Sequence, residues 1–519
     1  MSPPMSTDAL SDEELLQKAN KIFAPVTLPC GRVLPNRLAK APMYEHMAAM
    51  WGSEPHNGIL ALYKRWAEGD WGMVITGNVQ VAKDHLPLGR DMIVPDELTD
   101  ATLEPWRALA DIIRTPHAGS SKTADAPARS RSSNSPMARM PFARPLAPSP
   151  IRLGAHSPKE GWVGNLAHRL MLQTPREMTI EDIQHAVQQF VHGAQMAAQS
   201  GFDGVEVHAA HGYLVSQFIS PKSNTRTDEY SAETDPLHFL RDIVFGIRTA
   251  GVVSEDFVVG VKLNSADYSQ DTGTPSSDRP LSHVREIGKW GLVDFIEVSG
   301  GDYEDPQFID TVQKFKSPRQ VIFETFSARS MDILTDCVPT ATRRPPPLVI
   351  LTGGLNTLPR MASALAQDHA HLLGIARLAV LRPTLPTDIK HALATGDTRG
   401  LLTEPRQATV LGDPPASLLS LRTLERLVFS ILKFIWAFIP GRIPRIVGTS
   451  ASVQWYNIML RRIAFGQDVD YTLGLIGAAL RCYLGPTPYP PVVGDGSWRW
   501  WLAAALVGMA MGVGLGQVV

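Results

Sequence analysis

The stretch Gly201-Phe-Asp-Gly-Val-Glu-Val-His208-Ala-Ala-His211-Gly-Tyr213 decides the fold of this chain. It opens as a short apolar strand that ends at His208, and it then breaks into a polar loop with a second histidine and a tyrosine. A buried strand that ends in converging polar side chains is how a parallel α/β barrel presents a site. One histidine alone would indicate a core residue with satisfied hydrogen bonds, whereas His-x-x-His-x-Tyr at a strand end indicates a functional site.

Strands of the same kind recur along the chain, each short and apolar, with segments of helical period between them. Thr179 and Asp182 form a carboxylate variant of the capping box, which opens one of these helices. The expected strands lie at residues 34–45, 71–80, 205–208, 257–264, 293–301, 347–354 and 371–377. This alternation predicts an α/β protein with the (β/α)8 TIM-barrel fold.

The third strand of this barrel is missing or degenerate in the sequence. The helix expected over residues 103–114 leads almost directly into residues 119–150, which are rich in Ser, Ala, Pro and Arg and have no apolar period. Such a composition is typical of a disordered insert. Because a gap in a barrel opens two strand edges, three explanations stay open: a compromised chain, a faulty gene prediction, or a neighbouring segment that fills the gap.

Length, charge and cysteine content narrow the class of protein. The 519 residues suffice for one large barrel and additional segments. A net charge of -2 gives no reason to expect nucleic acid as a partner. Three distant cysteines exclude a disulfide framework and a four-cysteine iron–sulfur site, so no metal is expected and the chain suits a reducing compartment. Residues 1–20 form a polar, acidic lead that is unlike a signal peptide.

The opening stretch resembles the old yellow enzyme family of FMN-dependent oxidoreductases, and the resemblance covers roughly residues 21–410. In that family the histidine pair binds the carbonyl oxygen of an activated alkene and the tyrosine donates a proton to the alkene carbon. These roles would fall to His208, His211 and Tyr213. Two N–H donors polarise a carbonyl as charge develops on its oxygen, and a positioned phenol serves as general acid.

The resemblance therefore implies reduction of α,β-unsaturated carbonyl compounds, which are enone-type small molecules. The hydride must come from a cofactor, because no side chain can supply one. In the family it passes from NAD(P)H to the flavin and then to the alkene, and the two substrates take turns over the same flavin face. The chain has no strand-bound Gly-x-Gly-x-x-Gly, so no separate dinucleotide domain is implied.

The resemblance also implies residues that lie around the flavin ring. The backbone of Ala41, Pro42 and Met43, at the end of the first barrel strand, would lie against it. Gly77, at the end of the second strand, would let the backbone approach it closely. The family often has Thr or Cys where Tyr44 stands, so the role of Tyr44 stays open.

Further cofactor contacts are implied at the later strands. Lys262 stands where the family has a cation at the flavin N1/O2 edge; a lysine that extends to the surface is the alternative. Glycine-rich turns after strands 7 and 8 form a nest of backbone N–H groups for a phosphate. Gly353, Gly354, Ala376 and Arg377 are the residues expected around the FMN phosphate.

Beyond the barrel, residues 411–497 are expected to form a helical extension. Within it, residues 421–439 are either an interfacial amphipathic helix or a helix packed on the barrel. Residues 455–462 resemble the tail of fungal members of the family. The last twenty residues of the segment 498–519 carry no charge, and this length is sufficient to span a bilayer. The segment begins with tryptophans, which are typical of the membrane interface. They predict either a tail anchor, with the enzyme on the cytosolic face of a membrane, or a buried C-terminal helix.

Two functions follow from these observations. The first is an FMN-dependent ene-reductase that uses NAD(P)H. The second is a membrane-associated, catalytically impaired flavin-binding barrel, and the missing strand is its motivation. The choice between NADH and NADPH and the oligomeric state stay open.

Overall fold

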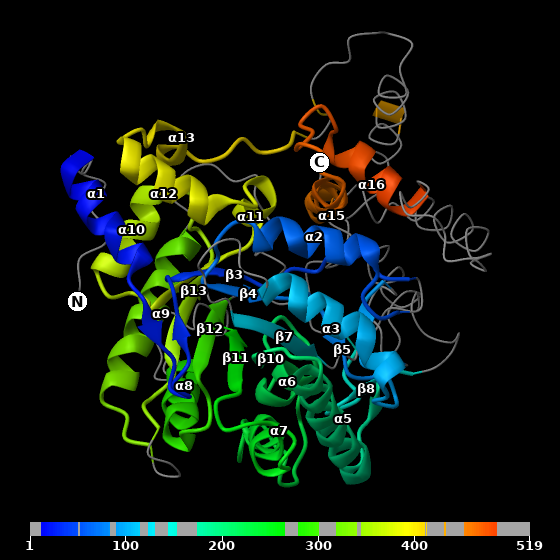
Figure 1. The fold of residues 1–519 in the computed structure, drawn as a ribbon. Helices are drawn as coiled ribbons and strands as arrows, with labels where there is room; N and C mark the ends of the chain where they lie inside the picture. Colours follow the sequence, from blue (N-terminus) through cyan, green and yellow to red (C-terminus); the bar gives the residue numbers. More distant parts are fainter. Residues whose placement is uncertain are drawn as a thin grey trace.

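The structure is a computed structural model, in which a parallel β-barrel is surrounded by helices (Figure 1). It describes residues 12–49, 52–83, 90–114, 123–129, 144–152, 174–264, 279–299, 318–339, 344–409, 412, 430–431 and 451–484. The barrel strands are β3 (Leu38–Lys40), β4 (Met73–Ile75), β7 (Thr123–Arg129), β10 (Gly204–Ala209), β11 (Val258–Asn264), β12 (Phe295–Ser299), β13 (Leu348–Thr352) and β14 (Leu372–Ile375). They pair in the order β10-β11-β12-β13-β14-β3-β4-β7, and a further pairing of β7 with β10 closes the barrel. Every pairing in this ring is parallel, so the predicted TIM-barrel fold is confirmed.

Strand β7 occupies the place of the strand that the sequence lacked. It pairs with β4 from Met73↔Thr123 onward and with β10 from Gly204↔Asp125 onward. Residues 123–129 belong to the stretch that composition assigned to a disordered insert, so that assignment is wrong for them. Three explanations for the missing strand were open, and the structure supports the one in which a neighbouring segment fills the gap in the barrel.

Helices cover the outside of the barrel and join its strands (Figure 1). They include α2 (Asn57–Ala67), α3 (Asp100–Arg114), α5 (Ile180–Gln199), α6 (Leu214–Ile219), α7 (His238–Thr249), α8 (Arg279–Trp290), α9 (Pro318–Thr335), α10 (Leu358–Ala366), α11 (Arg377–Leu381), α12 (Leu385–Thr395) and α13 (Arg399–Leu402). The capping box predicted for α5 is confirmed: Thr179 Oγ1 accepts from the Asp182 N–H, and the Asp182 carboxylate accepts from the Thr179 N–H. The chain enters through α1 (Asp12–Asn20), η1 (Lys21–Phe23) and the hairpin β1 (Val26–Thr27) and β2 (Val33–Leu34).

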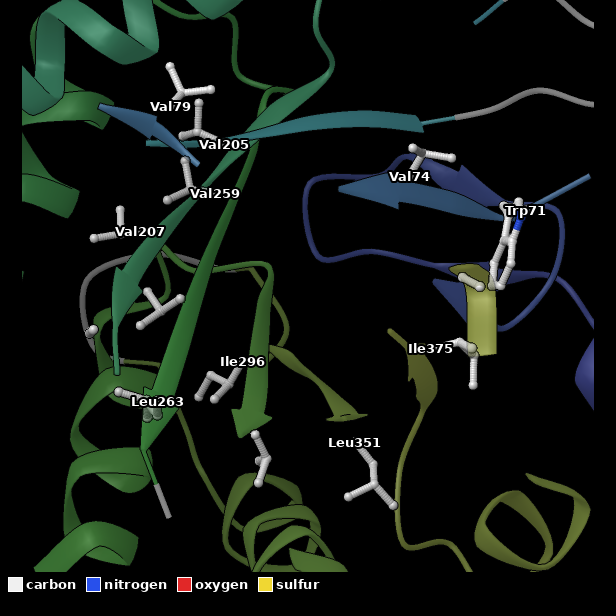
Figure 2. Close-up of a cluster of buried hydrophobic side chains, with 14 of the residues drawn as sticks. Trp71, Val74, Val79, Val205, Val207, Val259, Leu263, Ile296, Leu351 and Ile375 are labelled. Atoms are coloured by element: carbon white, nitrogen blue, oxygen red, sulfur yellow. The ribbon is translucent and has the colours of Figure 1, made fainter. Parts of the chain in front are cut away.

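Alternation along the strands separates two apolar regions. Outward side chains such as Val205, Val207 and Val259 pack with the helices in one large cluster (Figure 2). A smaller cluster fills the barrel near the amino ends of its strands: Leu28, Leu34, Ala39, Met73, Ile75, Val258, Phe295, Ile350 and Leu372. Because Val207 and Leu263 face the helices, their neighbours His208 and Lys262 face the barrel interior.

Short strands and a helical extension complete the fold. Strand β5 (Val79–Gln80) continues β4 and pairs with β7 and with β6 (Met92–Ile93), whereas β8 (Leu146–Ala147) pairs with β9 (Arg176–Glu177). Helices α15 (Ala451–Ala464) and α16 (Leu475–Leu484) pack on each other, and α15 also packs on α2 and α11 (Figure 1).

The membrane-related predictions fall mostly on residues that the structure does not describe. Among the described residues, no helix combines the length and the apolar character that a bilayer span requires. The predicted anchor, residues 498–519, and all but residues 430–431 of the amphipathic segment 421–439 lie outside this part of the chain.

The barrel interior leaves no room for a side chain at Gly260 of β11. A Cβ atom there would lie 2.0 Å from Cζ of Phe295. We expect Gly260→Ala to lower the free energy of unfolding by about 1–3 kcal/mol through overpacking. The urea midpoint measures this loss, and adding Phe295→Leu should recover part of it. Gly400→Ala is the matched control, since its nearest neighbour would be Arg382 Nη2 at 3.7 Å.

Candidate active site

The residues predicted for the site gather where the barrel strands end. His208 lies on β10 and Lys262 on β11, in register with each other. The other predicted residues follow the ends of β3, β4, β10, β13 and β14: Ala41, Pro42, Met43, Gly77, His211, Tyr213, Gly353, Gly354, Ala376 and Arg377. Because parallel strands end on the same side of a barrel, all of these residues share its carboxyl-terminal rim.

His208, His211 and Tyr213 form one compact cluster. The His208 ring centroid lies 5.0 Å from that of His211 and 4.5 Å from that of Tyr213, both edge to face. The Ala210 N–H donates to His208 Nδ1 at 3.1 Å, so the neutral His208 ring carries its proton on Nε2. Nε2 of His211 lies 3.0 Å from the Ser299 hydroxyl.

The backbone of this loop explains how the rings converge. His211 has φ 59° and Gly212 has φ 72°, so two consecutive residues are left-handed. This conformation is uncommon for histidine and costs about 1–3 kcal/mol, which the surrounding contacts must offset. It turns the chain so that Tyr213 becomes the N-cap residue of α6, with 7% of its surface exposed.

Lys262 does not extend to the surface. Its ammonium lies 2.7 Å from Glu297 Oε1 on β12, and the two side chains are 3% and 0% exposed. Burial works against ionisation of Glu297, but the charge of the adjacent Lys262 and its hydrogen bond to the carboxylate hold the pKa of Glu297 below its ordinary value. The barrel therefore contains a buried ion pair within the predicted site, in register with His208.

Glu297 and Glu206 are not among the residues predicted from the sequence, although their positions in it carry a signal. Each carboxylate interrupts an otherwise apolar strand, in Phe-Ile-Glu-Val and Val-Glu-Val-His, and each stands at an inward position. A charge at such a position requires a partner. The lysine on β11, between the two strands, supplies it for Glu297.

Gly77 has a packing role that is visible in the structure. Its N–H donates to Glu45 Oε1 at 2.8 Å and to Tyr63 Oη at 2.7 Å, and the Tyr63 hydroxyl itself donates to Glu45. A Cβ atom at Gly77 would lie 1.8 Å from Glu45 Oε2 and 2.2 Å from the Met43 carbonyl oxygen. Glycine is therefore required for the loop after β3 to pack on the end of β4. Burial and Glu45 together raise the pKa of Tyr63 well above its ordinary value, so the phenol stays a donor.

The turns after β13 and β14 have the features of a phosphate site. Gly353 and Gly354 have φ 130° and φ 70°, a backbone that side chains rarely allow. Arg377, the first residue of α11, is exposed and forms no ion pair with any residue that the structure describes. Backbone amides beside a cation without a carboxylate partner fit the phosphate of FMN. Within the described part of the chain, no group of histidine, cysteine or acidic side chains could hold a metal ion.

A closed parallel barrel that carries imidazole, phenol and ammonium groups at the carboxyl ends of its strands has the architecture of a barrel enzyme. Comparison with known proteins agrees. The sequence model of the NADH:flavin oxidoreductase / NADH oxidase family matches residues 21–396, and the chain belongs to this family. The resemblance to the old yellow enzyme family is thereby confirmed.

Individual relatives match most of the barrel. The NADH-dependent flavin oxidoreductase iliE of Hypocrea jecorina (strain QM6a) is 34% identical over 385 residues, which are 74% of this chain and 92% of that protein. Its namesake in Neonectria sp. (strain DH2) is 37% identical over 378 residues, 70% of this chain but only 46% of that longer protein. Among solved structures, morphinone reductase has the same fold, with a TM-score of 0.54 at 19% identity over 76% of this chain and 91% of that one.

The buried ion pair predicts how stability depends on pH. In Lys262→Met, Glu297 keeps its burial and loses its cation, so we expect a loss of about 3–5 kcal/mol at pH 7. Without the cation, burial places the folded-state pKa of Glu297 above its unfolded value, so stability should rise as the pH falls from 7 toward 5. The wild type should show no such rise, because its lowered Glu297 pKa contributes stability that is lost only as the pH falls below the ordinary carboxylate range.

Denaturant unfolding at several pH values measures both effects. The double variant with Lys262→Met and Glu297→Gln is the matched control, because it has no charge left at either position. It should be more stable at pH 7 than Lys262→Met alone and should show a smaller rise on acidification, because only Glu206 remains as a buried carboxyl there. A single variant that follows the wild-type pH profile would contradict the assignment.

Proposed function

We propose that this protein is an FMN-dependent oxidoreductase that uses NAD(P)H to reduce the activated C=C bond of α,β-unsaturated carbonyl compounds. The observation that carries the proposal is the cluster of His208, His211 and Tyr213 at the end of β10. Membership of the flavin oxidoreductase family supports it. Relatives named NADH-dependent flavin oxidoreductase and NADPH dehydrogenase support a nicotinamide reductant of either kind.

The residues of the chain divide between holding the cofactor and handling the substrate. Bound FMN would supply the hydride chemistry that side chains lack. The backbone of residues 41–43 and Gly77 would adjoin its ring, and Lys262 would face its N1/O2 edge. Gly353, Gly354, Ala376 and Arg377 would hold its phosphate.

The substrate half of the site rests on three side chains. His208, with its proton on Nε2, and His211, held by Ser299, would bind the carbonyl oxygen and stabilise the negative charge that develops there. Tyr213 would give its phenolic proton to the α-carbon. Its position as N-cap residue fixes its backbone beside both rings.

The alternative function, a catalytically impaired flavin-binding barrel, was inferred from the missing third strand. Because β7 closes the barrel, this argument no longer supports it. Flavin occupancy of the purified full-length chain tests the proposal directly. We expect a visible flavin band that bleaches on anaerobic addition of NADPH or NADH and returns when an enone is added. Folded protein that retains no flavin after incubation with FMN would overturn the proposal.

Tyr213→Phe separates proton donation from the other steps. We expect reoxidation by the enone to slow by about 10²–10⁴-fold, the usual contribution of a general acid, while flavin reduction by the nicotinamide changes little. Anaerobic stopped-flow measurement of the two half-reactions tests this. Tyr471→Phe, which alters a phenol packed on Trp455, is the control and should affect neither. Equal losses in both half-reactions would exclude Tyr213 as the proton donor.

A further inference from the structure

Helix α15 lies outside the part of the chain that the family model matches, yet it packs beside the rim. The match ends at residue 396, whereas α15 begins at Ala451. The helix packs on α2, which follows the loop after β3, and on α11, which follows β14 (Figure 1). It therefore adjoins the loop at one side of the predicted cofactor site and the turn at the other.

One arginine of α15 reaches the loop after β3. Arg461 is 4% exposed, and its Nη2 donates to the backbone carbonyl oxygen of His46 at 3.1 Å. Burying a guanidinium is costly unless its N–H groups find acceptors. The adjacent Arg462 is partly exposed and binds the Asp468 carbonyl oxygen within the extension itself. Arg461 thus differs from its neighbour in binding the backbone of the rim.

The carbonyl group that Arg461 binds belongs to a residue in an unusual conformation. His46 has φ 53° and is 2% exposed. Its Nδ1 lies 3.0 Å from the Tyr44 hydroxyl, and the two rings meet edge to face at 5.3 Å. Burial, with Arg461 and Arg90 nearby, lowers the pKa of His46 well below its ordinary value, so the ring is neutral. A continuous chain of contacts runs from α15 through His46 to Tyr44.

Tyr44 stands directly after the run Ala41-Pro42-Met43, whose backbone would adjoin the flavin ring. We propose that Arg461 is a positioning residue of the flavin site: it holds His46 in its left-handed turn, and His46 in turn holds the Tyr44 hydroxyl beside the run expected at the flavin ring. This inference rests on the proposed function. It gives the extension 451–484 a role in setting the properties of the cofactor.

A second contact of the same helix supports this placement. Tyr456, five residues before Arg461 on the same helix, is close enough to Arg377 for the guanidinium to oppose the rise in the pKa of Tyr456 that burial causes. Arg377 is the cation proposed for the phosphate. Helix α15 therefore meets both the loop predicted at the flavin ring and the turn predicted at its phosphate.

The test compares full-length variants by the dissociation constant and the midpoint potential of bound FMN. Arg461→Met should weaken FMN binding by about tenfold, the loss of one charge-assisted hydrogen bond, and should shift the potential. Arg462→Met is the matched control on the same helix and should change neither. Arg461→Lys should restore part of both, because an ammonium can donate to the same carbonyl oxygen.

A double variant distinguishes positioning from general support of the fold. If Arg461 acts through the Tyr44 hydroxyl, Arg461→Met should cause no further shift in potential once Tyr44→Phe is present. The same shift in both backgrounds, or an Arg461→Met variant indistinguishable from Arg462→Met, would overturn the inference.

A second variant covers the case in which Arg461→Met does not fold. His46→Asn tolerates the left-handed backbone but lacks the ring, and it should shift the potential only when the Tyr44 hydroxyl is present. The absence of such a shift would overturn the inference. Wild-type protein that binds no FMN would overturn the proposed function itself, whereas flavin-loaded, active protein insensitive to these changes would overturn only the role of Arg461.

Discussion

The structure depends on closure of the parallel barrel. An open strand edge leaves a row of backbone N–H and C=O groups without partners, and a parallel ring with one strand absent would have two such edges. Strand β7 removes both, because it pairs with β4 on one side and β10 on the other. The histidine cluster stands at the end of β10, so the strand that completes the ring also fixes the strand that carries the site.

Closure also creates an interior without water, in which burying a polar side chain costs free energy unless it has a partner. This cost determines which side chains the strands carry at their inward positions. Near their amino ends the inward positions are apolar, with Phe295 packed directly on Gly260. Toward the carboxyl ends the same strands carry Lys262 and Glu297, which neutralise each other at 2.7 Å. The polar part of the interior thus lies at the carboxyl-terminal rim, where the site is, and the apolar part lies toward the amino ends of the strands.

The sequence predicts the parts of this arrangement that depend on local pattern. The apolar strands, the capping box at Thr179 and the rim position of His208, His211 and Tyr213 all follow from residues near one another in the chain. Strand β7 does not follow, because Thr-Ala-Asp-Ala-Pro-Ala-Arg has little apolar character of its own and is held by backbone pairing to two distant strands. The composition of a segment indicates how much apolar surface it can bury. It does not indicate whether the segment pairs with the open edges of two distant strands.

Long-range polar contacts escape sequence reasoning for the same reason. Glu297 pairs with a residue 35 positions away, and Arg461 binds a carbonyl group 415 positions away. Both are buried charges whose partners only the folded chain brings near. Such contacts are costly to leave unmade, so they select one arrangement of the elements that carry them.

The loop after β3 is an example of a segment whose arrangement is fixed by buried hydrogen bonds. Glu45 accepts hydrogen bonds from Gly77 and Tyr63, and the carbonyl group of the next residue, His46, accepts one from Arg461. Two adjacent residues are thus held by different parts of the chain, one by the end of β4 and α2 and one by the C-terminal extension. Under the role proposed for Arg461, the position of Tyr44 depends on both sets of hydrogen bonds. The barrel and the extension therefore meet at this loop, although only the barrel lies within the part of the chain that the family model matches.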